Sequence, residues 1–346
     1  MLLVQPSSNR VYADAAPRLA AAELESFGVP GAVEERIAGV PYVAFDHPAG
    51  DVARLAYLSS GFALFAREGD LLRPVPLPPV QRYDDDLVTI PKYAGKTNEQ
   101  FTRLLLNVTV LSAGRELGDR LTVLDPLCGR GTTLNQALRY GYDAVGIEVD
   151  GKDVDAYAAF LKTWMRRKRL KHTASMDPVR RDRRLLARRF AATVAPDVAA
   201  HRAGDVQHLT VFHADTTRAR EFLRAGCADV IVTDTPYGVA HGSRAAGGLG
   251  RRPLDLLREA VPGWAELLRP GGALGMSWNT HVVKRAAAAE VLTGAGLHVV
   301  ETPDFAHWVD QSISRDVLVA VRPAPVGSPA PRSGAVTIPE HQKILI

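Results

Sequence analysis

The sequence is poor in cysteine and has no long apolar stretch. Two cysteines, Cys128 and Cys227, in 346 residues are too few for a disulfide framework and suit a reducing cytoplasm. No Cys and His residues have the spacing of zinc ligands, so we expect no metal. No segment approaches the roughly 18 apolar residues of a membrane helix, and the start lacks the basic region of a signal peptide. We therefore expect a cytoplasmic protein that contacts no membrane.

Acidic and basic residues almost balance, but the positive charge is concentrated in one segment. The net charge is +4. Residues Lys162–Arg189 contain twelve Lys and Arg against two Asp, which leaves that segment at +10 and the rest of the chain at −6. This asymmetry predicts a polyanionic partner, and a solvated insertion without a ligand is the alternative. The residues expected to contact nucleic acid are Arg166, Arg167, Lys168, Arg169, Arg180, Arg181, Arg183 and Arg184.

Residues 1–75 predict a small α/β accessory domain. The expected elements are a helix over Arg18–Gly28, a strand over Ile37–Phe45, a helix over Asp51–Gly61 and a strand over Phe62–Arg67. Residues 71–83 carry four prolines and indicate a semi-rigid linker, which we place at 76–92.

Residues 93–323 predict a second domain in which short strands alternate with helices. Thr97 and Gln100 suggest a capping box at the start of its first helix. The expected strands are Leu121–Leu124, Ala144–Ile147, Leu209–Phe212, Val230–Val232 and Ala273–Met276, with Val299–Thr302 and Val317–Val321 as a closing antiparallel pair. This alternation is typical of a mainly parallel sheet with helices on both faces. We also expect a basic insertion over 152–205 and a disordered tail over 324–346.

A glycine turn follows the first strand of this domain, in the sequence DPLCGRGTT. Glycines at 129 and 131 let the backbone approach a ligand closely. A dinucleotide fingerprint needs a third glycine three residues after Gly131, where the chain has Leu134. The loop therefore lacks a pyrophosphate cradle, and its preceding Asp125-Pro126 suits a cofactor with a cationic amino-acid arm.

Acids also end the next two strands. Glu148 lies 23 residues after Asp125, where a ribose-binding acid belongs, and Asp215 ends the third strand, where it could receive an adenine amine. Three such acids suit S-adenosylmethionine, a nucleoside with a positive sulfonium. The alternative is that Asp ends strands because it favours turns. The candidate cofactor-binding residues are Asp125, Pro126, Cys128, Gly129, Gly131, Glu148 and Asp215.

The fourth strand ends in Asp234-Thr235-Pro236-Tyr237. This tetrapeptide resembles the Asp/Asn/Ser-Pro-Pro-aromatic hallmark of the amino-methyltransferases. With KTNEQFTRLLLNVT and DPLCGRGTT ahead of it, residues 93–323 resemble the tRNA guanine-N2 methyltransferases of the THUMP-associated group. The resemblance implies a Rossmann-like class I methyltransferase fold with a mainly parallel seven-stranded sheet, S-adenosylmethionine as cofactor and tRNA as partner. Thr235 stands where that group has proline, and the N-terminal domain is shorter than a full THUMP module.

The tetrapeptide has a chemical rationale. An exocyclic ring amine is a poor nucleophile, and a carboxylate at Asp234 would accept one of its N–H groups and stabilise the developing positive charge. Pro236 restricts Thr235 to extended conformations, and Tyr237 offers a face on which a base can stack. Three alternatives stay open: a DNA adenine or cytosine amino-methyltransferase, a small-molecule N-methyltransferase, and a non-catalytic RNA-binding subunit.

Overall fold

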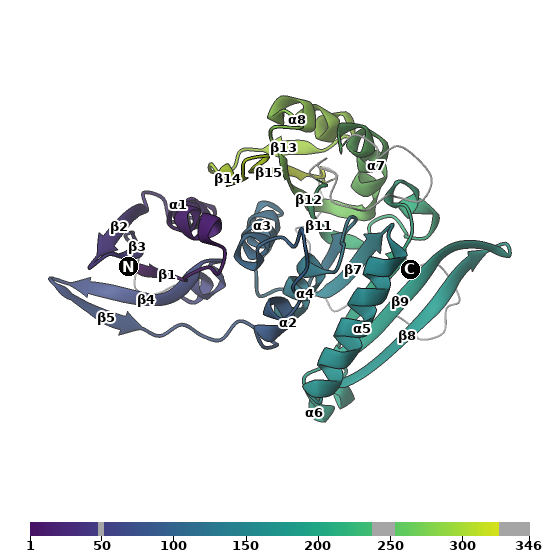
Figure 1. Cartoon of the computed structure of the whole chain (residues 1–346), viewed down its shortest axis with the longest axis horizontal. Coiled ribbons are helices and arrows are strands. Elements are labelled where there is room, and N and C mark those ends of the chain that lie inside the picture. Colours follow the sequence, from purple (N-terminus) through teal and green to yellow (C-terminus); the bar gives the residue numbers. More distant parts are fainter. Residues whose placement is uncertain (48–51, 237–252, 325–346) are drawn as a thin grey trace.

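Two sheets and a helix buried between them organise the chain (Figure 1). The computed structural model describes residues 1–47, 52–236 and 253–324. Tyr237 and the expected tail from residue 325 onward lie outside the described residues. Within the described ranges, no helix has the length and apolar character needed to cross a membrane.

The N-terminal sheet is antiparallel, with strand order β2-β3-β1-β4-β5. Its strands are β1 (Leu2–Val4), β2 (Val33–Ile37), β3 (Val40–Ala44), β4 (Gly61–Glu68) and β5 (Leu71–Val75), and its helices are α1 (Arg10–Ser26) and the 3-10 helix η1 (Ala53–Tyr57). The single strand predicted over Ile37–Phe45 is wrong, because the chain turns at Ala38-Gly39 and pairs β2 with β3. The predicted second helix is a short 3-10 turn. Pro74 lies in β5 at the sheet edge, where no inner neighbour needs its missing N–H.

The second sheet has the order β13-β15-β12-β11-β6-β7-β10-β9-β8, with β14 paired to β15. Its strands are β6 (Thr122–Asp125), β7 (Asp143–Glu148), β8 (Lys171–Arg181), β9 (Arg184–Ala195), β10 (Gln207–His213), β11 (Ala228–Asp234), β12 (Leu268–Asn279), β13 (His298–Val300), β14 (His307–Asp310) and β15 (Ile313–Val321). The seven strands from β13 to β10 are parallel except for β15. This is the Rossmann-like class I methyltransferase arrangement, which confirms the predicted fold class and the closing antiparallel pair. The sheet is larger than predicted because β8, β9 and β14 extend it.

Helices cover both faces of this sheet. They are α3 (Glu99–Ser112), α4 (Thr132–Arg139) and α5 (Gly151–Arg167) on one face, and the 3-10 helix η2 (Thr216–Glu221), α7 (Pro253–Leu267) and α8 (Arg285–Gly294) on the other; α2 (Asp86–Thr89) and α6 (Val198–Arg202) are short. Neighbouring strand residues alternate between two buried clusters, as Val123 and Leu124 do. Period-two alternation with apolar residues on both sides is what a two-sided parallel sheet requires.

Helix α3 is buried on every side. All residues from Phe101 to Val110 are buried, including the polar Arg103, Asn107 and Thr109. On one side α3 packs against β12, where a Cβ added at Gly275 would lie 1.8 Å from Thr109 Oγ1. On the other side it packs against α1 of the N-terminal sheet. The helix therefore joins the two parts of the chain.

A buried carboxyl connects α1 to α3. Glu23 is fully buried and accepts hydrogen bonds from Ser59 N (2.9 Å), Ser59 Oγ (2.6 Å) and Asn107 Nδ2 (2.7 Å). Burial raises the pKa of Glu23, and the hydrogen bonds partly offset that effect. Asn107 also donates to Tyr57 O (2.7 Å). The side-chain amide of Asn107 therefore connects α3 to both α1 and η1 of the N-terminal sheet.

The segment predicted as a linker, residues 76–92, packs against the second sheet. Tyr83, Leu87 and Val88 are buried, and Tyr83 donates from its hydroxyl to Gln207 Oε1 (2.6 Å). Trp164 is buried and donates to Asp86 Oδ1 (2.8 Å). This stretch connects the two sheets and is itself part of the core.

The Glu23–Asn107 contact predicts a measurable interaction free energy between α1 of the N-terminal sheet and α3. Asn107→Ala should lower the free energy of unfolding by about 1–3 kcal/mol, because a buried carboxyl loses a donor. A double-mutant cycle with Glu23→Ala, measured by urea unfolding, should give a coupling of at least about 0.5 kcal/mol. Thr293→Ala, which removes an exposed hydroxyl bonded only within α8, should change stability by less than about 0.5 kcal/mol. Strictly additive single effects would contradict the contact.

Candidate active site

A cavity of about 360 Å³ opens at the carboxyl ends of β6 and β11. Residues predicted from two separate motifs line it together: Asp125, Cys128 and Gly129 from the glycine turn, and Asp234, Thr235 and Pro236 from the tetrapeptide. Ligands of open α/β sheets bind at this edge. Tyr93, Thr97, Arg130, Thr132 and Asp153 also line the cavity, and sequence reasoning had given none of them a role in a site.

The glycine turn has the backbone that its sequence predicts. Gly129 and Gly131 have positive φ angles of 49° and 80°. A Cβ at Gly131 would lie 2.4 Å from the ring of Tyr157, whereas nothing lies within 4 Å of a Cβ at Gly129. Gly131 therefore lets α4 begin against α5, while the space at Gly129 leaves its backbone open to a ligand.

Asp125 is a buried carboxyl at the centre of the site. It accepts hydrogen bonds from Leu127 N (3.1 Å) and Thr233 Oγ1 (2.9 Å). Burial raises the pKa of Asp125 to about 7, and the hydrogen bonds oppose the shift. The next residue, Pro126, is buried as well. Asp125, Asp153 and Asp234 give the cavity three carboxyl groups. Arg130 pairs with Asp153 and Arg315 with Asp234, so Asp125 is the one of the three for which no ion pair is found among the described residues, and it is the group that would meet a cationic ligand.

The other two predicted acids have different surroundings. Glu148 ends β7 and accepts from Gly129 N (2.9 Å) and Asp150 N (2.7 Å), so it braces the glycine turn. Burial raises its pKa. Asp215 caps η2, accepting from Thr217 N (2.9 Å) and Thr217 Oγ1 (2.8 Å), which is the turn-forming role weighed as the alternative. Neither side chain is among those lining the cavity. Among the described residues, no group of three or more His, Cys, Asp or Glu is placed to hold a metal ion.

Three side chains hold the Asp234 carboxylate. Thr97 Oγ1 donates to Oδ2 (2.6 Å), Ser277 Oγ on β12 donates to Oδ1, and Arg315 Nη2 on β15 lies 3.3 Å from Oδ2. The Arg315 side chain is 5% exposed and its guanidinium lies 4.6 Å from the centre of the Phe101 ring. A carboxylate held by partners from three directions is oriented before any ligand binds.

Thr235 stands where the motif that the tetrapeptide resembles has proline, and its contacts explain how the turn is held. Its backbone N–H donates to Ser277 O (2.9 Å), and its hydroxyl donates to the same oxygen (3.0 Å). A proline could make neither bond. Thr235 is buried and extends the pairing of β11 with β12 by one residue, so two hydrogen bonds replace the rigidity of a ring.

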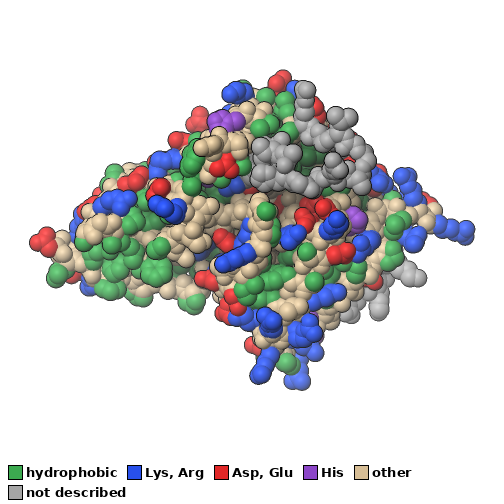
Figure 2. Space-filling view, viewed as in Figure 1, with side chains coloured by type: hydrophobic (Ala, Val, Ile, Leu, Met, Phe, Trp, Pro, Cys, Tyr) green, Lys and Arg blue, Asp and Glu red, His purple; other side chains and the backbone are tan. Residues whose placement is uncertain are grey.

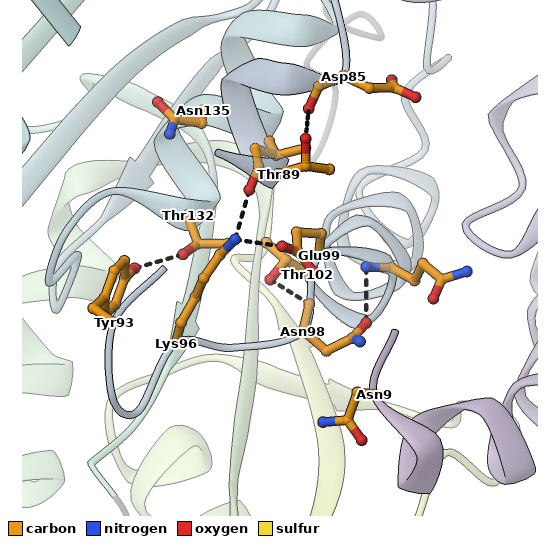
Figure 3. A network of polar contacts seen from close by, with 12 residues as sticks. Asn9, Asp85, Thr89, Tyr93, Lys96, Asn98, Glu99, Thr102, Thr132 and Asn135 are labelled. Atoms are coloured by element: carbon orange, nitrogen blue, oxygen red, sulfur yellow. Dashed lines mark hydrogen bonds and ion pairs between the residues drawn. The ribbon is translucent and has the colours of Figure 1, made fainter. Parts of the chain in front are cut away.

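The segment before α3 lines the cavity, and Figure 3 shows its polar contacts. Tyr93 and Thr132 share a hydroxyl hydrogen bond (2.8 Å), and Lys96 donates to Val88 O (2.6 Å) and pairs with Glu99. Burial raises the pKa of Tyr93 to about 12. Arg130, paired with Asp153 (2.8 Å), lies 5.1 Å from the centre of the Tyr93 ring. Tyr93 therefore contacts the glycine turn through Arg130 and Thr132, and Thr97 at the other end of the segment contacts Asp234.

The predicted capping box is wrong. The residue that caps α3 is Asn98, whose Oδ1 accepts from Gln100 N (2.9 Å) and Phe101 N (3.0 Å). Thr97, one residue earlier, faces Asp234 instead. The polar sequence KTN ahead of an apolar helix signals a helix start and gives no sign of which polar side chain turns toward the distant Asp234.

The eight residues predicted to contact nucleic acid form two groups. Arg166, Arg167, Lys168 and Arg169 lie at the end of α5, and Arg180, Arg181, Arg183 and Arg184 lie at the tip of the β8–β9 hairpin. Nine residues of β8, Lys171–Val179, separate the groups, a length of roughly 30 Å at the usual strand rise. The structure does not bring the eight together.

No family model matches the sequence, and no curated protein matches it. Among solved structures the chain is similar to TrmN from Thermus thermophilus, with 17% identity, a TM-score of 0.38 and coverage of 68% of this chain and 51% of that one. It is also similar to a precorrin-6y C5,15-methyltransferase from Geobacter metallireducens (13% identity, TM-score 0.41, 70% and 98% coverage). A third is the 1,6-didemethyltoxoflavin-N1-methyltransferase of Burkholderia thailandensis, bound to 1,6-didemethyltoxoflavin and S-adenosylhomocysteine (14%, 0.38, 64% and 78%). The chain spans about half the length of the Thermus protein. Because these likenesses are distant, the fold assignment rests on the strand order.

The two glycines of the turn predict different outcomes for the same substitution. Gly131→Ala combines a left-handed backbone with a clash against Tyr157, so it should lower the free energy of unfolding by more than about 2 kcal/mol. Gly129→Ala places a Cβ on a left-handed backbone without any clash, so it should lower the free energy of unfolding by about 1 kcal/mol. Urea unfolding of the two variants tests this order, and an equal or reversed order would show that the turn has another geometry.

Proposed function

We propose that the protein transfers a methyl group from S-adenosylmethionine to an exocyclic amine of a nucleic-acid base. The observation that carries this proposal is the shared cavity, in which the oriented carboxylate of Asp234 and the glycine turn with Asp125 face the same space. A methyl donor and an amine acceptor must meet within about 3–3.5 Å for transfer. A cavity lined by both motifs supports the proposal because a donor and an acceptor could bind in it side by side.

The cavity has the features that this cofactor needs. A volume of about 360 Å³ is within the usual range for small-molecule sites. Three carboxyl groups suit a ligand with an ammonium and a sulfonium, and the open space at Gly129 admits it next to the backbone. We assign the amino-acid arm to Asp125. We assign the ribose hydroxyls to Glu148, which does not itself line the cavity but accepts from the backbone of the lining residue Gly129 through one carboxylate oxygen. The bound cofactor would supply an electrophilic methyl group.

Asp234 would be the residue that acts on the target amine. Its carboxylate would accept an N–H of the target amine, which raises electron density on nitrogen. It would also stabilise the positive charge that develops as the new N–C bond forms and the methyl–sulfur bond breaks. The methylated nitrogen would then lose one N–H proton through the Asp234 carboxylate to solvent. Thr97, Ser277 and Arg315 keep the carboxylate in one orientation, so it need not reorient when the amine binds. The two hydrogen bonds of Thr235 direct the adjoining backbone.

The nucleic-acid substrate and its base are the finer parts of the proposal. The charge of +10 over Lys162–Arg189 supports a polyanionic substrate. The resemblance of the DTPY, glycine-turn and KTNEQ segments supports guanine N2 in tRNA, with Tyr237 as the stacking residue. A DNA adenine or cytosine amine is the second candidate, since the same carboxylate chemistry would serve it.

The proposal predicts label transfer that depends on Asp234. With labelled S-adenosylmethionine, the purified protein should methylate unmodified tRNA and leave plasmid DNA unlabelled. Asp234→Ala should lower kcat by at least about 100-fold while the cofactor Kd changes less than about threefold, because the contact strengthens only in the transition state. Thr97→Val, which removes one of the three partners, should give an intermediate loss. Label in DNA alone would favour the second candidate, and full turnover by Asp234→Ala would place the chemistry elsewhere.

Asp125 predicts a pH dependence of cofactor binding. Its pKa of about 7 in the unliganded site means that below pH 7 the carboxyl is largely protonated and must lose that proton to meet a cationic arm. Affinity for S-adenosylmethionine should therefore rise as pH increases, by about tenfold between pH 6 and pH 8. Asp125→Asn should bind more weakly and show a flat profile in calorimetry. A flat profile in the wild type would remove Asp125 from the cofactor site.

A further inference from the structure

The β8–β9 hairpin extends beyond the sheet on the side of the candidate active site. In the register of β9 against β10, Arg188 pairs with His213, the last residue of β10. Strand β9 begins four residues earlier, at Arg184, and the turn lies at Asp182-Arg183. The hairpin therefore projects roughly 14 Å past the carboxyl end of β10. Figure 1 shows it as a long arm at one side of the sheet, with its base near α6.

The arm is anchored where it leaves the sheet. Ala187 is buried and Val179 partly buried against the apolar cluster on the face covered by η2 and α7. Arg188 pairs with Asp155 of α5 (2.7 Å). Leu186 beyond them is half-buried, and residues 180–185 are exposed, including Leu185. The tip is thus a solvated element on a fixed base.

The exposed part carries concentrated positive charge. Arg180, Arg181, Arg183 and Arg184 are all exposed, and among the described residues none of these four forms an ion pair. In Figure 2, Lys and Arg side chains gather over the end of the arm. Successive strand residues point to opposite faces, so Arg180 and Arg181 carry charge to both sides of the ribbon. A flat anionic surface would meet only one of those sides, whereas a folded polyanion can present phosphates to both.

The turn itself is unusual for a two-residue hairpin. Asp182 and Arg183 both have positive φ, 49° and 65°, in the turn type whose second position favours glycine. The turn between β2 and β3 has the same form and holds Ala38-Gly39, with φ of 50° and 82°. Arg183 therefore stands where glycine would relieve backbone strain, which indicates that the charge has a use other than folding.

The second basic group has a different position. Strand β8 begins at Lys171, opposite Ala195 and near the amino end of β10, so Arg166–Arg169 lie at the edge away from the cavity. Lys168 there pairs with Asp84 and Asp86 (both 2.6 Å). The charge of this group is partly balanced within the fold.

We propose that the tip of the β8–β9 hairpin, formed by Arg180, Arg181, Arg183 and Arg184, binds phosphates of a folded RNA substrate and that the basic end of α5 does not. This inference rests on the proposed function. Four strand spacings separate β9 from β11, which places the arm roughly 19 Å to the side of Asp234. Phosphates some distance from the target base would meet the arm while the base enters the cavity.

The experiment compares two sets of arginines in the full chain. The tip variant combines Arg180→Gln, Arg181→Gln, Arg183→Gly and Arg184→Gln, and the control combines Arg166→Gln and Arg167→Gln. Binding of unmodified tRNA transcripts is measured by fluorescence anisotropy across a salt series, with KM, kcat and the cofactor Kd measured alongside. We expect the tip variant to bind tRNA at least about tenfold more weakly, with a log–log salt slope shallower by about 2–3. Its KM should rise with kcat and cofactor Kd unchanged, and the control should stay within about twofold of wild type.

A single substitution separates binding from folding. Arg183→Gly should bind tRNA about two- to fivefold more weakly while its melting temperature stays equal or rises, because glycine relieves the strained turn. A tip variant that binds tRNA as tightly as wild type with an unchanged slope would overturn the inference, as would a control that weakens as much as the tip variant. A wild-type protein that neither binds nor methylates tRNA would instead overturn the proposed function.

Discussion

The all-round burial of α3 is the constraint on which the rest of the structure depends. The helix lies between β12 and α1, so its position is set from both sides. The residue just ahead of its cap, Thr97, is thereby delivered to Asp234, and Phe101 one turn into it lies against Arg315. Packing of the N-terminal sheet and orientation of the candidate catalytic carboxylate are in this way consequences of the same helix.

The site combines a left-handed glycine turn with hydrogen bonds that hold the neighbouring backbone. Gly131 permits a left-handed turn next to Tyr157, and Glu148 ties the neighbouring Gly129 to the end of β7. Thr235 shows the same principle at the tetrapeptide, where two bonds to one carbonyl replace a proline ring. A local departure from a motif is tolerated when nearby strands supply the lost rigidity.

Local signals and topology explain which parts could be predicted from the sequence. Alternating strands and helices imply a common carboxyl edge, and Asp125 and Asp234, which end two of the predicted strands, do share a cavity. Ser277 and Arg315 sit in β12 and β15 with no motif around them, and only the sheet order brings them to Asp234. Charge counting found the basic segment but not the hairpin that divides it, because strand register is a tertiary property.

The arm also has a consequence for the solubility of the chain. Strand β8 is the outermost strand of the described sheet, so it presents backbone donors and acceptors with no neighbouring strand on one side. Such a row is a template on which another strand can add, and lysine, arginine and proline along it discourage that addition. Strand β8 contains Lys171, Pro178, Arg180 and Arg181. The charges at this edge therefore also disfavour pairing of β8 with an edge strand of a second copy of the protein.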